Sequence, residues 1–265
     1  MSALPTDEDT QFEQAAALLA DASNLLFVTG AGISADSGLP TYRGVSGLYE
    51  DEDAEDGLPI EVCLSGQVFR SQPALTWKHI RHIEAACRGA EPNAGHLAIA
   101  TLERRLERVW VLTQNVDGLH AAAGSRNVIA IHGDVHELRC TACAWRAHVD
   151  DYSQLDPALP RCPSCAAVIR PDVILFGEML PMAALRTLER ELERGFDAVV
   201  TIGTTAVFPY IAAPVQQAKF AGRPTIEINP ANSEVSALVD LHLRIGAAEA
   251  MTGILAALER RWAET

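Results

Sequence analysis

The sequence predicts an α/β fold in which a parallel sheet carries helices on both faces and a small zinc-ribbon and helical domain is inserted in the chain. Short apolar runs alternate with helical patterns along most of the sequence. That alternation is typical of parallel strands buried on both faces. The first apolar run ends in a glycine turn, and two C-x2-C pairs interrupt the alternation before residue 170.

Each element is expected from the period of its apolar residues or from a continuous apolar run. The expected helices are 11–22, 73–87, 94–107, 183–195, 210–221 and 247–262. The expected strands are 25–28, 109–113, 128–131, 198–202, 225–229 and a weaker one at 241–245. Helix 73–87 places Leu75, Ile80, Ile83 and Cys87 near one face.

The turn after the first strand reads Gly-Ala-Gly-Ile-Ser over residues 30–34. Gly30 allows a tight turn, and Gly32 lets backbone N–H groups approach a pyrophosphate at a helix N-terminus. A tight turn that binds no ligand needs the same residues, so this motif alone is weak evidence. The acidic residue expected about 20 residues later, to hold a ribose, is missing. Residues 50–56 are acidic without a strand pattern and favour a solvated loop instead.

Residues 39–49 carry glycines and a proline, which favour a loop. A long loop beside a glycine turn is a candidate lid, and a disordered connector is the alternative. Tyr42 and Arg43 favour the lid, because connectors without a task are usually more polar and less aromatic.

Composition bounds the class of protein. The chain has 265 residues, 48% of them hydrophobic, and a net charge of −14. This charge disfavours a nucleic-acid partner and suits basic, lysine-rich substrates, although solubility alone accounts for it equally well. No apolar run reaches the length of a membrane span, so no membrane partner is expected. The polar, acidic N-terminus resembles no targeting segment, and we expect a cytoplasmic protein.

Four of the six cysteines form two pairs, Cys140 with Cys143 and Cys162 with Cys165, separated by eighteen residues. This spacing is a zinc signature, and four thiolates give a closed tetrahedral site. A closed site leaves no position for water, so we expect one structural zinc ion. Two disulfides, or free thiols, are the alternatives, and disulfides are disfavoured without a secretory signal.

Three polar stretches stand at strand ends, where open α/β sheets bind ligands. Residues 113–120 include amides and a carboxylate suited to a ribose and a carboxamide. His132 follows the strand at 128–131, and an imidazole suits a general base. Gly203 begins a hydroxyl-rich turn suited to phosphates. The alternatives are structural: a histidine at a strand end is more often a core or surface residue than a catalyst, and Gly203 is also what a simple turn requires.

Together these motifs resemble the sirtuins, the NAD-dependent protein lysine deacylases. The resemblance rests on residues 30–43, 113–120 and 170–181, on His132-Gly133, and on the two cysteine pairs. It implies a discontinuous Rossmann-like NAD-binding domain and a small helical and zinc-binding domain. The implied domain ranges are 1–48, 92–135 and 170–265 for the first, and 49–91 and 136–169 for the second.

The resemblance also implies a role for each site residue. His132 would be the base, with Asn115 and Asp117 beside it in the catalytic site. NAD, consumed as a co-substrate, would contact Gly30, Ala31, Gly32, Ile33, Ser34, Tyr42, Arg43, Tyr49, Gln114, Asn115, Asp117, Gly203, Thr204, Thr205, Asn229 and Ala247. The acyl-lysine protein or peptide would pair with residues 174–177, contacting Ile174, Phe176 and Gly177, with Phe176 lining the acyl tunnel. The acyl group would pass to ADP-ribose, with release of nicotinamide.

One departure concerns the acyl group. Relatives that remove acidic acyl groups carry a Tyr and, three residues later, an Arg, where this chain has Ile80 and Ile83. An apolar pair cannot neutralise a carboxylate, so we expect no preference for acidic acyl groups. Two other functions stay open: mono-ADP-ribosyl transfer, and a non-enzymatic NAD-sensing or zinc-ribbon interaction module. His132, Asn115 and Asp117 together favour an enzyme.

Overall fold

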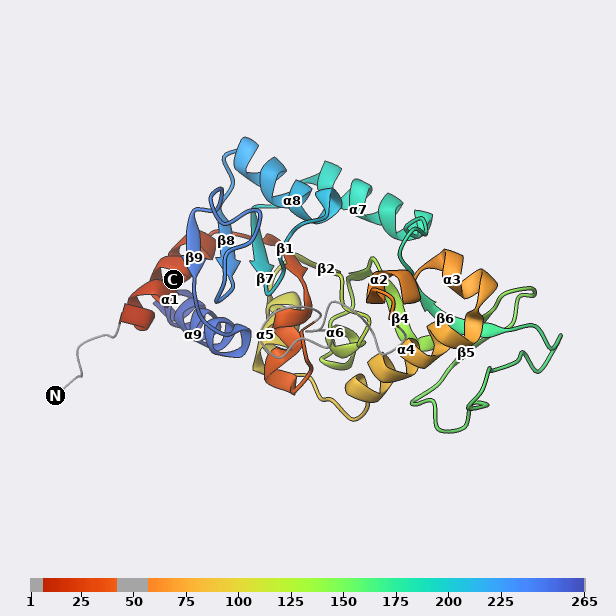
Figure 1. The fold of residues 1–265 in the computed structure, drawn as a ribbon. Coiled ribbons are helices and arrows are strands. Elements are labelled where there is room, and N and C mark those ends of the chain that lie inside the picture. Colours follow the sequence, from red (N-terminus) through yellow and green to blue (C-terminus); the bar gives the residue numbers. More distant parts are fainter. Residues whose placement is uncertain (1–6, 42–56, 265) are drawn as a thin grey trace.

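A computed structural model describes residues 7–41 and 57–264. Within these residues the chain forms a six-stranded parallel sheet in the order β3-β2-β1-β7-β8-β9 and a three-stranded antiparallel sheet in the order β5-β4-β6. Figure 1 shows the two sheets in separate parts of the molecule. We call the six-stranded sheet with its helices the large unit. The three-stranded sheet, α2–α4 and the cysteine pairs are the small unit.

The elements alternate as the fold class requires. The strands are β1 (Asn24–Thr29), β2 (Arg108–Thr113), β3 (Val128–Ala130), β4 (Gly133–Cys140), β5 (Arg146–His148), β6 (Ile169–Val173), β7 (Ala198–Ile202), β8 (Thr225–Ile228) and β9 (Leu241–Leu243). The helices are α1 (Asp7–Leu19), α2 (Ile60–Cys63), α3 (Gly66–Ser71), α4 (Pro73–Cys87), α5 (Ala94–Arg105), α6 (Leu119–Ala122), α7 (Met182–Arg194), α8 (Pro209–Phe220) and α9 (Ala247–Glu264), with a 3-10 helix η1 (Ala31–Ser37).

Helices cover both faces of the large sheet (Figure 1). On one face α1, α5 and α9 close an apolar core that includes Phe27, Leu102 and Ile254. On the other face α7 and α8 close a second core that includes Leu26 and Val215. Alternate residues of β1 therefore enter different cores, as side chains of successive strand residues must.

The small unit has a core of its own, built around the side chain of Trp77 in α4. The indole N–H of Trp77 donates to the carbonyl of Ile169 at 2.9 Å, and the ring meets that of Tyr152 edge-on at 5.5 Å. Buried indoles and phenols need such partners, because an unpaired polar group in a core is costly. The contacts join α4 to β6 and to the loop after β5.

The predicted fold class is confirmed, and most predicted elements lie within a few residues of their expected bounds. The first helix begins at Asp7 and not at residue 11. The sequence prediction missed β4, β5, β6, α2, α3 and α6. Apart from β4, which spans eight residues, these are short elements, and several carry polar residues at buried or half-buried positions, so their apolar period is weak. The expected lid and the acidic run at 50–56 fall largely on residues 42–56, outside the described part of the chain.

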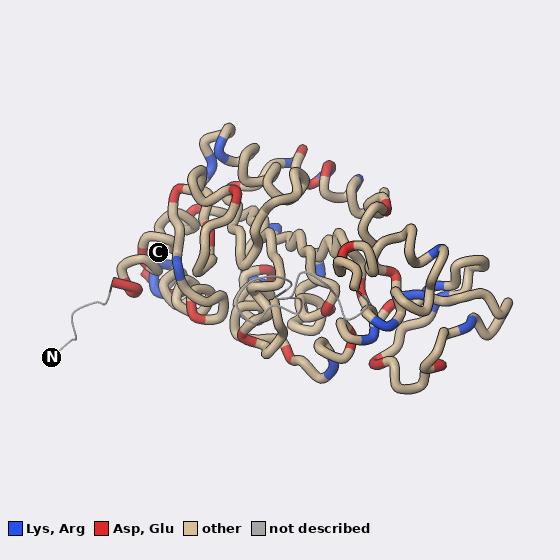
Figure 2. The backbone as a smooth tube through the Cα atoms, in the orientation of Figure 1, with Lys and Arg blue, Asp and Glu red and all other residues tan. Residues whose placement is uncertain are grey.

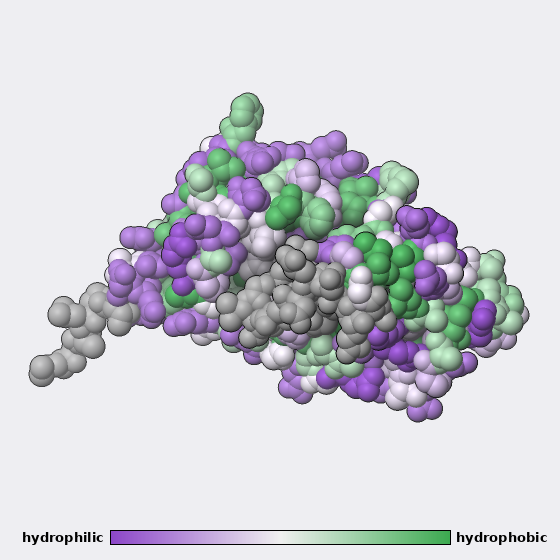
Figure 3. Space-filling view, in the orientation of Figure 1, coloured by the Kyte–Doolittle hydropathy of each residue, from purple (hydrophilic) through white to green (hydrophobic). Residues whose placement is uncertain are grey.

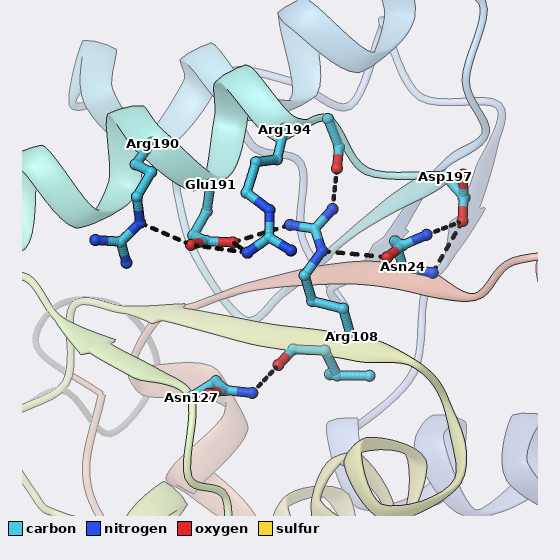
Figure 4. A network of polar contacts seen from close by, with 9 residues as sticks. Asn24, Arg108, Asn127, Arg190, Glu191, Arg194 and Asp197 are labelled. Atoms are coloured by element: carbon cyan, nitrogen blue, oxygen red, sulfur yellow. Dashed lines mark hydrogen bonds and ion pairs between the residues drawn. The ribbon is translucent and has the colours of Figure 1, made fainter.

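A polar network ties α7 to the amino-terminal ends of β1 and β2 (Figure 4). Arg108 of β2 donates to the buried carboxylate of Glu191 at 3.0 Å and to the carbonyl of Gly195. Arg190 and Arg194 reach the same carboxylate at 3.0 and 3.1 Å. Elsewhere acidic and basic residues are spread over both units (Figure 2), and hydrophobic and hydrophilic side chains are interspersed on the visible face (Figure 3).

Candidate active site and zinc centre

The carboxyl ends of β1, β2 and β7 meet at one edge of the large sheet. There Gly30 donates its backbone N–H to Ile202, and Gln114 donates to Thr29, both at 3.0 Å. Parallel strands end at the same edge, so the loops that follow them in the chain converge on one place. The predicted stretches at 30–34, 113–120 and 202–205 are brought together in this way.

The glycine turn opens a 3-10 helix, η1, and its glycines are needed for a contact within the chain. The N–H of Gly32 donates to the carbonyl of Gly203 at 2.9 Å. A Cβ on Gly32 would stand 2.6 Å from the Gly203 Cα, closer than any real contact. Gly203 also has a positive φ of 57°. The two loops therefore pack backbone to backbone, which leaves their outer N–H groups and hydroxyls to line the site.

A cluster of polar side chains joins η1 to the loop after β2. Ser34 donates its hydroxyl to the Asp117 carboxylate at 2.7 Å. The Asn115 amide donates to the Gly30 carbonyl and to Ser34 Oγ, both at 3.1 Å. The Asp117 carboxylate also accepts the Leu119 N–H at 3.0 Å. Ser34, Asn115 and Asp117 are thus held in fixed rotamers beside a cavity of about 160 Å³ that both Asn115 and Asp117 line.

A second cluster joins the β2 loop to the loops after β7 and β8. The Gln114 amide donates to the Thr204 hydroxyl at 2.7 Å, and that hydroxyl accepts the Ala206 N–H at 3.1 Å. Asn229 donates to the Thr204 carbonyl at 3.1 Å. Thr204 is buried at the centre of these bonds, so it links three strand ends.

His132 lies in the turn between β3 of the large unit and β4 of the small unit. Its Nδ1 is 3.1 Å from the Gln114 carbonyl, and its Nε2 is 2.8 Å from the Tyr210 hydroxyl. A carbonyl only accepts, so Nδ1 carries the proton, and the lone pair of Nε2 accepts the Tyr210 hydroxyl. Burial lowers the pKa of His132, and the bond to the Gln114 carbonyl offsets this only in part. The imidazole is therefore neutral near neutral pH and ready to accept a proton at Nε2.

The other predicted dinucleotide contacts are dispersed around this edge. Ile33 is fully buried in the first core, Ala247 is buried at the start of α9, Ala31 is half-buried and Thr205 is exposed. Tyr42, Arg43 and Tyr49 lie outside the described residues.

The predicted peptide-binding segment, 174–177, runs between the two units. Ile174 donates its N–H to the His132 carbonyl at 2.9 Å, and Phe176 donates to Leu64 at 2.9 Å. Gly66 donates to the Phe176 carbonyl in turn, while the Phe176 side chain is exposed. Gly177 has a positive φ of 77° with open space around it. The segment is thus anchored next to the base by its own backbone.

An ion pair between buried Arg170 and half-buried Glu178 contacts the backbone of this segment. Arg170 meets Glu178 through two hydrogen bonds, at 2.7 and 3.0 Å, and also donates to the Val173 carbonyl at 2.7 Å. Burial of Glu178 would raise its pKa, but the bonds from Arg170 and Leu175 outweigh burial and hold the pKa below its ordinary value. Two parallel bonds to a carboxylate fix geometry as well as charge.

Ile80 and Ile83, the predicted acyl-chain contacts, belong to the core of the small unit. Ile80 is 2% exposed within that core, and Ile83 is partly buried and packs against it. Their spacing of three places both on the inner face of α4. In this structure they pack α4 onto its neighbours, and their part in acyl selection stays a prediction.

The four paired cysteines converge. Their sulfur atoms all lie within 4.8 Å of one another, with Cys140 3.4 Å from Cys165 and Cys143 3.6 Å from Cys162. Tetrahedral zinc–sulfur bonds of about 2.3 Å place sulfur atoms roughly 3.8 Å apart, whereas a disulfide requires about 2.05 Å. The disulfide alternative is therefore wrong. The N–H of Ala142, 3.3 Å from Cys140 Sγ, is the largest cause that lowers the pKa of this one thiol to about 6, whereas for Cys143 and Cys165 the N–H groups of Trp145 and Ala167 are outweighed by burial and by the neighbouring sulfurs, which raise the pKa. A thiolate is the ligand form that zinc requires.

Sequence reasoning missed three residues that shape the site. Tyr210 bonds to His132, and the Arg170–Glu178 pair lies beside segment 174–177. Tyr210 is 78 positions from His132 in the chain, so no local pattern could have joined them. Arg170 and Glu178 flank a motif that the resemblance already includes, but their spacing alone does not indicate a buried pair.

Comparisons with known proteins agree with this geometry. The Sir2 family model matches residues 30–209. "NAD-dependent protein deacylase 2" of Pseudomonas syringae pv. tomato is 50% identical over 245 residues, covering 91% of this chain and 98% of that protein. The chain belongs to the Sir2 family.

Two solved structures are similar over nearly the whole chain. A Sir2 homolog in complex with NAD superposes with a TM-score of 0.82 at 37% identity, covering 94% of both chains. A Sir2 protein with a p53 peptide and NAD+ gives a TM-score of 0.76 at 28% identity, covering 91% of this chain and 95% of the other.

Among the described residues, no helix combines the length and apolar character needed to cross a membrane.

Proposed function

We propose that this protein is an NAD-dependent protein lysine deacylase that transfers the acyl group of an acyl-lysine protein or peptide to ADP-ribose and releases nicotinamide. The observation that carries the proposal is the geometry of His132. Its Nδ1–H is committed to the Gln114 carbonyl, so its basic nitrogen is Nε2, which the Tyr210 hydroxyl contacts in this structure. The family membership and the NAD complex of a relative support the same activity.

The site residues fit a dinucleotide. Gly32 and Gly203 approach so closely that any Cβ would collide, which lets the loop backbones line a narrow trough. The hydroxyl groups of Ser34 and Thr204 and the amide of Asn115 stand along the same edge, as ribose and phosphate groups require. We assign them, with the other predicted contacts, to NAD. When bound, NAD supplies the ADP-ribose that receives the acyl group.

The chain's own residues then have distinct tasks. Asn115 and Asp117 are both hydrogen-bonded to the Ser34 hydroxyl, which holds their rotamers. They orient the ribose end of the dinucleotide. His132 takes a proton at Nε2 from a ribose hydroxyl, and its neutral state makes the lone pair available. General-base catalysis of this kind contributes roughly 10²–10⁴ in rate. The zinc centre lies in the small unit and takes no part in these steps.

The peptide substrate fits the segment at 174–177. An extended peptide that adds a strand beside this segment would place its acyl-lysine next to His132, because Ile174 is bonded to the His132 carbonyl. Exposed apolar side chains occur on this segment and just after it, at Phe176 and Met179, and before α8, at Val207 and Phe208, whose ring is 6.0 Å from that of His132. We propose that these side chains cover the apolar part of the substrate.

We further propose the division into a domain of residues 1–48, 92–135 and 170–265 and a second of residues 49–91 and 136–169. The separate cores of the large and small units support it. We also propose a cytoplasmic protein with no nucleic-acid or membrane partner, on the basis of its net charge of −14 and its reduced cysteines.

Mass spectrometry of an acetyl-lysine peptide incubated with the protein and NAD tests the activity. We expect free lysine, nicotinamide and O-acetyl-ADP-ribose, and we expect His132→Ala to lose 10²–10⁴ in turnover while it retains NAD binding. ADP-ribose on a protein side chain without deacylation would favour the transferase alternative. NAD binding without turnover by the wild type would favour the sensing module. Near-normal turnover of the variant would remove His132 from its role.

The acyl chain offers a finer prediction. A carboxylate that enters a closed tunnel needs a cation or strong donors, or binding suffers. The side chains of Ile80 and Ile83 offer only apolar surface. We expect higher kcat/KM for acetyl-lysine, and for longer unbranched acyl groups, than for succinyl-lysine in one peptide. A succinyl value equal to the acetyl value would contradict this and indicate a cation elsewhere, with Arg81 the first candidate.

A further inference from the structure

The base has a neighbour that the proposed reaction does not use. The Tyr210 hydroxyl stands 2.8 Å from Nε2 of His132, the atom that has to accept a proton. Because Nδ1–H is engaged by the Gln114 carbonyl, Nε2 is the acceptor and Tyr210 is the donor. In the free protein, the one basic lone pair of the site is therefore already occupied.

The phenol is held there by its surroundings. Tyr210 lies in the first turn of α8, and its ring stacks on that of Phe208 with centroids 5.5 Å apart and planes 14° from parallel. Both rings meet the imidazole edge-on, at 6.1 and 6.0 Å. Burial raises the pKa of Tyr210, so it remains a neutral donor at neutral pH. The contact is thus built by the packing of two rings against the imidazole, of which Tyr210 is half-buried and Phe208 is 40% exposed.

An unprotonated imidazole nitrogen has a single lone pair. Two donors cannot both align with it, so a ribose hydroxyl can deliver a proton to Nε2 only after the Tyr210 hydroxyl has moved away. This deepens the proposed function and rests on it. We propose that Tyr210 is a positioning residue for His132: its hydroxyl holds Nε2 in the free protein and yields the lone pair to a ribose hydroxyl of the dinucleotide.

The consequence for protonation has a definite sign. A donor on Nε2 stabilises the neutral imidazole, so it keeps the base from taking a proton from water before the dinucleotide arrives. Among the described residues, the groups that contact the ring are the Gln114 carbonyl, Tyr210 and Phe208, and burial is the main cause of its lowered pKa. Removing the hydroxyl should raise the pKa of His132 in the free protein by a few tenths to about one unit.

Tyr210→Phe tests the proposal, because it removes the hydroxyl and keeps the stacked ring. We expect the acid limb of kcat/KM for NAD, which reports the free protein, to move to higher pH by that amount. The acid limb of kcat, which reports the bound complex, should stay in place. If the acid limb of kcat/KM does not move, Tyr210 does not hold Nε2 in the free protein. If the acid limb of kcat moves by the same amount, Tyr210 does not release Nε2 when the dinucleotide binds.

A measurement without turnover separates this proposal from the activity itself. NMR titration of the His132 ring should give a higher pKa in Tyr210→Phe than in the wild type, and the two should converge in saturating ADP-ribose. A difference that persists with ADP-ribose would overturn the release. If ADP-ribose binds neither the wild type nor Tyr210→Phe, the proposed function fails, and so does the proposal that Tyr210 yields Nε2 to the dinucleotide. The titration of the free proteins still decides whether the Tyr210 hydroxyl holds Nε2.

Tyr152→Phe is the matched control. It also removes one phenol hydroxyl, which donates to the Val135 carbonyl in the core of the small unit. This variant should be less stable, because a buried carbonyl loses its partner. It should leave both acid limbs and the His132 titration where the wild type has them. A shift as large as that of Tyr210→Phe would assign the effect to general loosening and overturn the proposal.

Discussion

In the large unit, β7 and β8 are buried at every residue between helices on both faces, whereas in the small unit β5 has exposed residues at both ends. The large unit buries continuous apolar strands in two cores. The small unit relies on links between polar or sulfur groups: four cysteines, the Arg170–Glu178 pair and the Trp77 N–H. Small sheets bury too little surface to be stable by apolar packing alone.

His132 lies where the two units meet, between β3 and β4. Its ring is held by the large unit through Gln114 and Tyr210, while its carbonyl is bonded to Ile174, which follows β6. The position of the base therefore depends on both units, although they are stabilised in different ways. Perturbing one unit at a time separates the two contributions.

Metal removal should give the largest effect. Zinc bound by four thiolates contributes folding free energy outright in so small a module. We expect chelation, or Cys140→Ala, to unfold the small unit at a lower temperature than the large unit and to abolish deacylation. Calorimetry should then show two transitions where the metal-bound protein shows one. Cys87→Ala, which removes a half-buried thiol outside the cluster, is the control. Zinc-free protein that is folded and active would show that the small unit does not depend on the metal for its stability.

The buried carboxylates come next. Glu178→Ala leaves the guanidinium of Arg170, which is 3% exposed, without its partner and should cost about 3–5 kcal/mol in unfolding free energy. Glu191→Ala in the large unit should cost less, about 1–3 kcal/mol, because two of its three arginine partners are more than half exposed.

Denaturant unfolding measures both losses, and kcat/KM should fall only for Glu178→Ala, which loosens the peptide segment. Glu178→Gln, which keeps a hydrogen-bond acceptor, should recover part of the loss. Equal losses of stability and activity in the two alanine variants would contradict this ranking.

Acid should weaken the large unit by a smaller amount. His96 and His120 are buried with ring centroids 4.8 Å apart, and three of their four ring nitrogens have no hydrogen-bond partner within the described residues. Burial lowers the pKa of both, that of His120 to about 3. For His96 a weaker attraction to Asp117 opposes the shift.

The unfolded chain, whose histidines titrate near pH 6.5, therefore binds more protons than the folded protein below that pH. Stability is complete above about pH 6.5 and is lost as pH falls toward 3. At pH 5.5 we expect a loss of about 1–3 kcal/mol in unfolding free energy relative to pH 7.5. Replacing His120 by Gln should flatten this dependence, and replacing the exposed His82 should not. The same slope in both variants would contradict a role for the buried pair.

The sequence by itself determined the parallel sheet, because strands such as 198–202 are mostly apolar and alternate with amphipathic helices. It also determined the zinc centre, since thiol pairs at that spacing have few other uses. Motif order and spacing sufficed to identify the family. All of these signals are local, or depend only on the order of local signals along the chain.

The tertiary structure decided what distant residues do to one another. Only the packed chain brings Gly32 against Gly203, Tyr210 against His132 and Glu178 beneath the peptide segment. Only packing placed Ile80 in the core of the small unit. There its apolar side chain stabilises α4, so its apolar character does not by itself indicate contact with a substrate. Such contacts join residues far apart in the chain or depend on rotamers, so neither periodicity nor spacing carries them. The lowered pKa of His132 has the same origin, because burial is a property of the whole fold.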